Sequence, residues 1–456
     1  MESKSESKVL ALAGGGPVTG LHIGALERLR DVGELKTFNV WSLSCIGAWV
    51  GIIYLQADPG REIEQTRAFF HDKVFREDES YKRFPINTVF GPDLLSNQRA
   101  LLQFLADPES YCHLVLPKQY VAAARDMLRF LMDPRKWWDL RAWTDGELNQ
   151  RMLDLLSAHP ASRFLTSMLY LSSINGLSRI YYPGSPFLAS IRFDRLNEFG
   201  KPLVYHNAWN LSRQKLELFT NRPVPGRNYR RITDKSLCAC SALPYIEATV
   251  EIDGDTYCEG ALVDTVNFHD LVRDLPDLEE VWVSRLVDTS QIRPPRNLTE
   301  ALGNLCMLFA AETGKNDIKL FKYHLDEESL CDKKEIRVVE LPVSARVNFD
   351  WSRANLARGI EEGREAVDIA RSHVKQLDDV RKRANEDLDT FVKTQEAHIR
   401  DAEAELLLQL AGSMDDRIRV LRLAVAKAQG RSRAVTRHSI RAELLDMAEK
   451  RYAAIA

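Results

Sequence analysis

Two stretches near the N-terminus decide the fold: Lys8-Val-Leu-Ala-Leu-Ala-Gly14-Gly15-Gly16-Pro17-Val18-Thr19-Gly20 and Phe38-Asn-Val-Trp-Ser-Leu43-Ser44-Cys45-Ile46-Gly47-Ala48. Each reads as a short apolar strand that runs through a tight turn into a helix, the first helix being expected over 21–32. The first turn is rich in glycine, so its backbone N–H groups are free to face a negative charge, and the second carries a single small nucleophile. Such turns at neighbouring strand ends are the parts that an acyl-transfer site needs.

The composition is that of a globular protein. Its 456 residues are 45% hydrophobic and 28% charged, enough for one large domain with an appendage. The formal net charge of −3 gives no overall attraction for nucleic acid. The polar start of the chain predicts no signal peptide, and no apolar run reaches the roughly 18–20 residues that span a bilayer. We therefore expect a cytoplasmic protein.

The cysteines indicate neither a disulfide framework nor a metal site. Their number, seven, is odd, which fits a reducing compartment better than a set of structural disulfides. Cys238 and Cys240 have no second Cys or His pair at the spacing of metal ligands. No metal and no organic cofactor is expected.

Alternating strands and helices predict an α/β fold of three layers with a mostly parallel sheet, over a domain that we place at 8–345. Within it, 58–180 is helical in pattern and rich in aromatic residues such as Trp137, Trp138 and Trp143, and is expected to form a wall or cap. Further strands are expected at 203–207, 216–220, 248–252, 256–258, 280–284 and 336–341.

The remaining residues, 346–456, predict a helical extension resembling a coiled coil. Apolar residues recur there at steps of three and four, at Leu377, Val380, Ala384, Leu388 and Phe391. Gly412 and Gly430 are expected to interrupt the helices. Such an extension packs on the core or pairs with a second subunit, which makes a homo-oligomer one expectation.

The glycine-rich turn does not fit the common nucleotide-binding patterns. It lacks the third glycine of a dinucleotide-binding turn, and the next strand ends in Cys45 where that fold has an acidic residue. It also lacks the Gly-Lys-Ser/Thr ending of a P-loop. A purely structural turn is the remaining alternative. As an oxyanion hole, the site would use the N–H groups of Gly14, Gly15, Gly16 and Ile46.

Cys45 is the predicted nucleophile. A nucleophile at a strand–helix elbow needs a small residue two positions later, and Gly47 supplies it. If Ser44 were the nucleophile, the β-branched Ile46 would occupy that place. The positive end of the following helix is expected to favour the Cys45 thiolate. The alternative is that Cys45 is only a small buried hydrophobe.

Glu259 is the predicted base, because a strand delivers it into a turn of small residues. Asp253 lies in an Asp-Gly hairpin tip, where its role is structural, and Asp264 is a second candidate acid. His22 and His269 lie nearest to these motifs in sequence, but neither has the context of a base. The site therefore reads as a dyad.

These three elements, in this order, resemble the patatin-like phospholipase family of acyl hydrolases. The likeness runs from about residue 8 to 288 and includes Ser241-Ala242-Leu243-Pro244, which is similar to the family's small-residue segment upstream of the acid motif. By this resemblance, the family's serine corresponds to Cys45 and its aspartate to Glu259. The resemblance implies a lipid acyl ester as substrate, with contact to a lipid surface left open.

The chain also departs from the family pattern. Leu43 replaces the first glycine of the elbow, and Val18 and Thr19 stand where the oxyanion loop often carries arginine. We expect an active enzyme that passes through an acyl thioester, because both changed dyad positions keep reactive groups. An acyltransferase with the same dyad and an inactive scaffold are the alternatives.

Overall fold

The computed structural model describes residues 7–79, 93–115, 118–139, 146–182, 184–268, 270–329, 336–343 and 348–395. The helices are α1 (Gly20–Asp31), α2 (Ile46–Gln56), α3 (Glu62–Phe69), α5 (Leu94–Ala106), α6 (Lys118–Met132), α7 (Pro134–Trp137), α9 (Glu147–Ala158), α10 (Pro160–Tyr170), α11 (Pro186–Ala189), α12 (Asp234–Cys240), α13 (Leu271–Asp274), α14 (Leu298–Ser329) and α15 (Arg353–Gln395). The strands are β1 (Ser7–Leu12), β2 (Val40–Leu43), β3 (Gly176–Ser178), β4 (Leu203–Asn210), β5 (Lys215–Thr220), β6 (Arg230–Arg231), β7 (Tyr245–Glu247), β8 (Val250–Ile252), β9 (Asp255–Glu259), β10 (Leu278–Ser284) and β11 (Arg337–Leu341).

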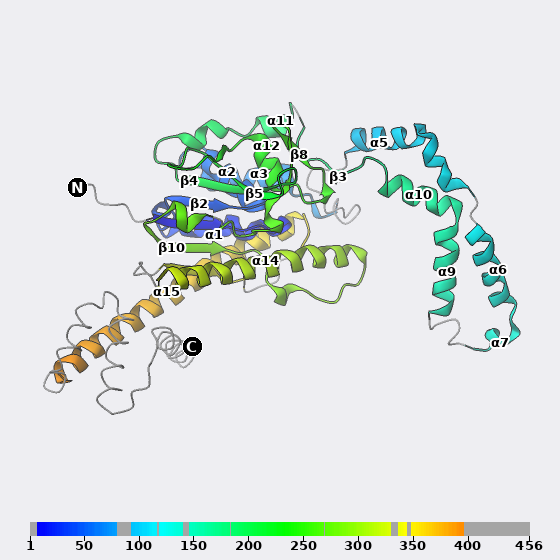
Figure 1. The fold of residues 1–456 in the computed structure, drawn as a ribbon. Coiled ribbons are helices and arrows are strands. Elements are labelled where there is room, and N and C mark those ends of the chain that lie inside the picture. The colour runs from blue at the N-terminus through cyan, green and yellow to red at the C-terminus, as the bar shows by residue number, and fades with distance from the viewer. Residues whose placement is uncertain are drawn as a thin grey trace. The chain divides into compact units, whose positions relative to one another are not determined.

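The centre of the fold is a mixed, mostly parallel sheet (Figure 1). Its main order is β11-β10-β1-β2-β4-β5-β6, and β9 pairs with both β4 and β8. The pairs from β11 to β4 are parallel, whereas β5 and β9 run antiparallel to β4. The predicted α/β class is confirmed. Each strand range predicted downstream of the helical segment overlaps an observed strand, while the short β3, β6 and β7 were not foreseen.

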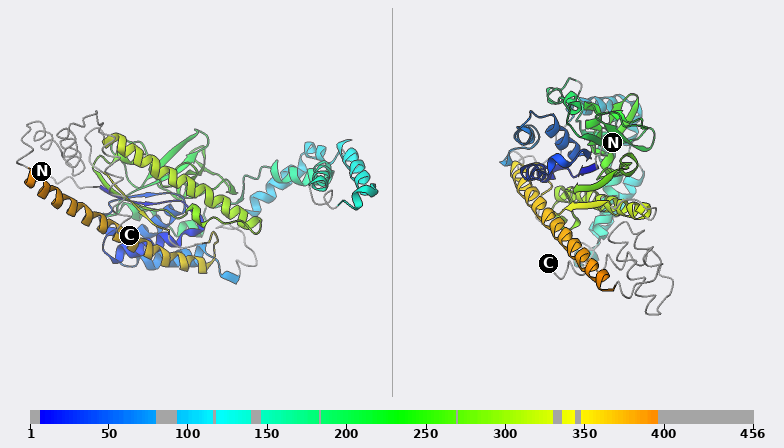
Figure 2. Two further views of the ribbon diagram at one scale, coloured as in Figure 1. Left: turned by 90° about the horizontal axis from the view of Figure 1, so that it is seen from below. Right: turned by 90° about the vertical axis from the view of Figure 1, so that its left-hand side faces the viewer.

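Helices cover both faces of the sheet, as Figure 2 shows for α14 and α1 on opposite sides. On one face, Val9 and Ala11 of β1 pack in one core with Ile318 and Phe321 of α14. On the other face, α1 and α2 contact β10 and β1. Alternate residues of β1 thus point to different helical layers, which explains why the strand is apolar on both sides.

The segment predicted to be helical, 58–180, is helical over most of its described residues. Aspartates cap several of these helices: the Asp93 side chain accepts a hydrogen bond from the Ser96 N–H at the start of α5. Trp137 and Trp138 are 60% and 88% exposed, so their role is not core packing. Trp143 lies outside the described residues.

The chain divides into two compact units, 1–367 and 368–456. Within the first unit, the start of α15 crosses α1 at backbone contact. A Cβ at Gly20 or Gly24 would collide with carbonyl oxygens of α15, and one at Gly363 would collide with the Leu21 carbonyl. Small residues on both helices therefore permit this close packing.

The backbone around the predicted apolar seam from 377 to 391 belongs to α15, so the helix there is confirmed. The side chains of the seam, and the predicted interruptions at Gly412 and Gly430, lie outside what the structure describes. Among the helices that the structure describes, none is long and apolar enough to cross a membrane.

Candidate active site

Cys45 lies at a sharp turn between β2 and α2, with φ 47° and ψ −122°. A non-glycine residue with such a positive φ is strained, and strained residues of this kind cluster at functional sites. Two residues on, a Cβ at Gly47 would collide with the Leu12 carbonyl oxygen of β1. A glycine at 47 lets α2 cross β1 closely enough to aim its N-terminus at the turn.

Leu43 stands where the elbow pattern has its first glycine, and the structure shows how the chain accommodates it. The Leu43 side chain is fully buried beneath α2. On that helix, a Cβ at Gly51 would lie 2.7 Å from Leu43 Cδ1. The larger residue on the strand is thus matched by a glycine on the helix above it.

Strand register brings Glu259 to Cys45. Leu43, two residues before the nucleophile, pairs with His206 of β4. Glu259, the last residue of β9, pairs with Ala208, two residues further along the same strand. Strand β9 therefore continues along β4 where β2 ends, and places the Glu259 carboxylate close enough to the Cys45 thiol for each group to affect the pKa of the other.

Burial dominates the electrostatics of this pair. Cys45 is 7% exposed and Glu259 6%. Loss of solvation raises the pKa of Glu259 to about 7. Burial, followed by the charge of Glu259, raises the pKa of the Cys45 thiol well above its usual value. The expectation that the helix N-terminus favours the thiolate was wrong, because the backbone of Ile46 lowers this pKa by less than burial and Glu259 raise it.

The other candidate groups hold structural positions. The buried Ser44 hydroxyl donates to Asn207 Oδ1 at 3.0 Å. The Asp264 carboxylate accepts two backbone N–H groups of its own turn, at 2.7 and 3.1 Å. Asp253 has an 82% exposed side chain at a hairpin tip. In the part of the chain that the structure describes, these hydrogen bonds and ion pairs do not join Ser44, Asp264 or Asp253 to the Cys45 thiol.

The His22 side chain contacts the residue that precedes the glycine-rich turn. Its Nε2 lies 2.8 Å from the Ala13 carbonyl oxygen and its Nδ1 lies 2.8 Å from Ser284 Oγ. Burial lowers its pKa to about 4, so the ring is neutral near neutral pH. The contacts fit a tautomer in which Nε2–H donates to the Ala13 carbonyl and Nδ1 accepts from the Ser284 hydroxyl. His269 lies outside the described residues.

One of the three glycines in the turn is already engaged. The Gly14 N–H donates to the Thr265 carbonyl at 3.0 Å, so it has a partner before any substrate arrives. Gly16 has φ 55°, a conformation that favours glycine. At Gly15, a Cβ would lie 2.7 Å from Leu286 Cβ. The turn is therefore packed too tightly for side chains.

Residues 10–272 match the model of the patatin-like phospholipase family, which is more than half of the chain. The chain belongs to the patatin-like phospholipase family. The comparison with curated proteins found no match.

Several solved structures resemble this patatin-like chain. VipD from Legionella pneumophila aligns over 96% of this chain and 90% of its own, with 13% identity and a TM-score of 0.36. A human GIVD cytosolic phospholipase A2 in complex with methyl gamma-linolenyl fluorophosphonate aligns over 82% of this chain and 59% of its own, with 12% identity and a TM-score of 0.33. ExoU in complex with SpcU from Pseudomonas aeruginosa aligns over 99% and 76%, with 11% identity and a TM-score of 0.21.

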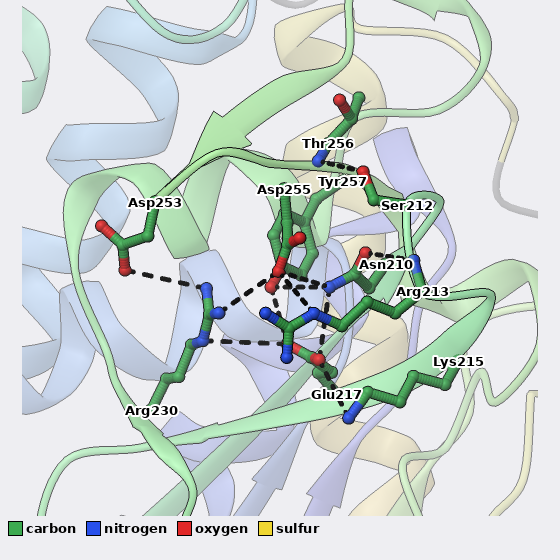
Figure 3. A network of polar contacts seen from close by, with 10 residues as sticks. All are labelled: Asn210, Ser212, Arg213, Lys215, Glu217, Arg230, Asp253, Asp255, Thr256 and Tyr257. Atoms are coloured by element: carbon green, nitrogen blue, oxygen red, sulfur yellow. Dashed lines mark hydrogen bonds and ion pairs between the residues drawn. The ribbon is translucent and has the colours of Figure 1, made fainter.

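In this patatin-like domain, a polar network fixes the hairpin that carries Glu259 (Figure 3). The tip has φ 51° at Asp253 and 85° at Gly254, as a two-residue hairpin turn requires. At the start of β9, Asp255 forms ion pairs of 2.9 Å with Arg213 and 3.3 Å with Arg230. These contacts tie the hairpin to the neighbouring strands, and so hold the opposite end of β9 in register.

A cavity of about 470 Å³ opens on Cys45 and Glu259. The residues that line it are mainly apolar. Helix α14 supplies six of these residues: Leu302, Leu305, Cys306, Phe309, Ala310 and Thr313. These residues were not among those predicted from the sequence, although their spacing of three and four along one helix is the pattern of an apolar helix face. From the aromatic-rich segment, only Phe70, Val74 and Ile180 line the cavity among the residues that the structure describes.

Proposed function

We propose that this patatin-like protein is a lipid acyl hydrolase whose nucleophile is Cys45 and whose base is Glu259. The observation that carries the proposal is the pairing of a buried thiol with a buried carboxylate, at a strained turn and in the wall of one apolar cavity. Core packing does not explain Glu259, because a buried carboxylate costs free energy that an apolar residue would not.

The reaction follows from these positions. The Cys45 sulfur attacks the ester carbonyl while its proton passes to Glu259. The N–H groups of Gly15, Gly16 and Ile46 stabilise the oxyanion, since Gly14 is engaged by Thr265. The intermediate expels the alcohol, which takes the proton from Glu259, and leaves an acyl thioester on Cys45. Water then attacks the thioester carbonyl while its proton passes to Glu259. The Cys45 sulfur leaves and takes that proton back, which frees the carboxylic acid and restores the starting site.

The cavity supports an acyl chain as the group that is bound. Aromatic and aliphatic side chains such as Phe70, Phe309 and Trp351 surround it, and its volume falls within the range of small-molecule sites. The lining residues that the structure describes include no lysine or arginine. The acyl part of the substrate, more than a charged headgroup, would therefore supply the binding free energy.

Acyl transfer is the second candidate, and one observation favours it. Cys45 and Glu259 are each less than a tenth exposed, so water has restricted access to the thioester. Thioesters also pass their acyl group readily to alcohols and amines. An acceptor that fits the cavity would then compete with water.

Hydrolysis of p-nitrophenyl esters of increasing chain length tests the proposal. We expect activity in the unaltered protein, a loss of at least about 10²-fold in Cys45→Ala and Glu259→Gln, and no change in Cys112→Ala, whose cysteine is exposed on another segment. Adding alcohols to the reaction separates transfer from hydrolysis by the products. Equal activity in all four proteins would refute the dyad. No activity in any of them would refute the hydrolase and favour the alternative of an inactive scaffold.

A further inference from the structure

Three consecutive residues, of which the first is the last residue of α12, each contact a different part of the proposed site. The Cys45 N–H donates to Cys240 Sγ at 3.0 Å. The indole N–H of Trp49, on the elbow helix α2, donates to Ser241 Oγ at 2.6 Å. The Glu259 N–H donates to the Ala242 carbonyl at 3.0 Å. One short segment thus contacts the nucleophile, its helix and the base.

The contact to Cys45 falls where the backbone needs support. A positive φ at a non-glycine residue costs about 1–3 kcal/mol and persists only where the surroundings enforce it. Cys240 Sγ accepts from the Cys45 N–H, and its thiol is also 3.9 Å from the Cys45 carbonyl oxygen, in donor geometry. A single buried thiol, that of Cys240, therefore contacts both the backbone N–H and the backbone carbonyl of Cys45.

The contact to Glu259 fixes the other partner. Its backbone N–H, at the end of β9, is bonded to the residue two positions after Cys240. The segment runs from the last residue of α12 toward β7, and Ser241 also lines the cavity. A displacement of this segment would change the separation of the Cys45 sulfur and the Glu259 carboxylate.

We propose that residues 240–242 form a positioning clip that sets the geometry of Cys45 relative to Glu259, with Cys240 as the positioning residue for the nucleophile. The inference rests on the proposed function for its catalytic readout. Cys240 does not touch the reacting carbonyl in this scheme. It acts through the backbone of Cys45.

Cys238 provides a matched control. It lies two residues earlier on the same helix and is likewise fully buried. Among the described residues, its thiol makes no hydrogen bond to Cys45 or Glu259. Cys238→Ala and Cys240→Ala each remove one buried sulfur from α12, but only the second removes the acceptor for the elbow.

The test compares kcat and KM for p-nitrophenyl butyrate, and thermal stability, in Cys240→Ala, Cys240→Ser and Cys238→Ala. A misplacement of about 1 Å can cost about 10²-fold in rate. We expect Cys240→Ala to lower kcat about 10- to 100-fold with KM within about twofold, and Cys240→Ser to recover most of it, because its hydroxyl accepts the same N–H. Cys238→Ala should keep the kcat of the unaltered protein, at a melting temperature similar to that of Cys240→Ala. Equal kcat in the two alanine variants, or no recovery with serine, would overturn the clip.

A second readout does not depend on hydrolysis. Alkylation by iodoacetamide, followed by peptide mapping, reports the accessibility of Cys45 even if no ester is cleaved. The clip predicts severalfold faster alkylation at Cys45 in Cys240→Ala, with Cys112 unchanged, because a loosened turn exposes the sulfur. An unchanged or slower rate at Cys45 would overturn the clip, while absent hydrolysis in the unaltered protein would count only against the proposed function.

Discussion

The Cys45 thiol lies beside the Glu259 carboxylate, and both groups are less than a tenth exposed to water. Because burial raises the pKa of each group, the thiolate is not the resting form of the nucleophile. The proton must leave the sulfur as the new bond forms, and Glu259 is the group placed to receive it. This arrangement makes the carboxylate a requirement for reaction, in contrast to a cysteine that is already ionised.

The pH dependence of acylation should report Glu259. Its pKa is raised to about 7, and only the ionised form accepts the proton. We expect the acylation rate to rise with pH, to reach half its plateau near pH 7, and to fall about tenfold for each unit below pH 6. Stopped-flow release of p-nitrophenol between pH 5 and 9 measures this. A flat profile, or one that falls as pH rises through 7, would exclude Glu259 as the base.

The same shift predicts a change in stability. The pKa of Glu259 is about 7 in the folded chain and 4.5 as its ordinary value. A raised folded-state pKa gives stability that is complete below about pH 4.5 and is lost as pH rises through about 7. Glu259→Gln removes this loss. The free energy of unfolding of the variant, relative to that of the unaltered protein, should therefore be roughly 2 kcal/mol higher at pH 8 than at pH 5. Urea denaturation at the two pH values measures the gain. A constant difference between the proteins would show that burial does not shift this carboxyl.

Gly47→Ala should be strongly destabilising. Its Cβ would meet the Leu12 carbonyl oxygen, and backbone cannot move aside as a side chain can. We expect a loss of about 2–4 kcal/mol in the free energy of unfolding. Gly303→Ala on α14 is the control, because a Cβ there would lie 3.7 Å from Phe349, an ordinary contact. Similar melting temperatures for the two variants would contradict the close crossing of α2 and β1.

Leu43 and Gly51 should be energetically coupled. A Cβ at Gly51 would lie 2.7 Å from Leu43 Cδ1, so Gly51→Ala forces the leucine to move. In a Leu43→Ala background the space is free, and Gly51→Ala should then cost little. A double-mutant cycle measured by chemical denaturation should give a coupling of about 1–2 kcal/mol. Additive effects would mean that the two residues do not compensate for each other.

Ala310 should influence the preferred chain length. It lines the cavity from α14, and Ala310→Phe would fill part of the space. We expect kcat/KM for long-chain esters to fall at least about tenfold while the value for the acetyl ester changes little. Ala301→Phe, earlier on the same helix and not among the lining residues, is the comparison. An equal effect on short and long esters would place the acyl chain elsewhere.

The sequence predicted what local patterns encode. The strand–turn–helix signals around Gly14 and Cys45, the reason for glycine at 47 and the hairpin at Asp253 all follow from backbone rules for short segments. The helix around 377–391 was readable from its apolar spacing. The α/β class followed from the alternation of strands and helices.

The sequence could not predict the effects that depend on tertiary packing. The pKa of Cys45 was assigned the wrong direction because burial and the approach of Glu259 are not local properties. The bond between Gly14 and Thr265 joins residues far apart in the chain, as does that between Cys45 and Cys240. Contact with a lipid surface, pairing through the C-terminal helices and a cytoplasmic location stay predictions.

The most direct test of the central claim is to find the acyl group. The protein is mixed with p-nitrophenyl butyrate, quenched in acid during turnover, digested with trypsin and mapped by tandem mass spectrometry, with Cys45→Ala in parallel. The tryptic peptide 37–61 contains Cys45 and no other cysteine. The account predicts one butyryl group on Cys45 and none in the variant. A butyryl group on Ser44, or turnover that persists in Cys45→Ala, would contradict it.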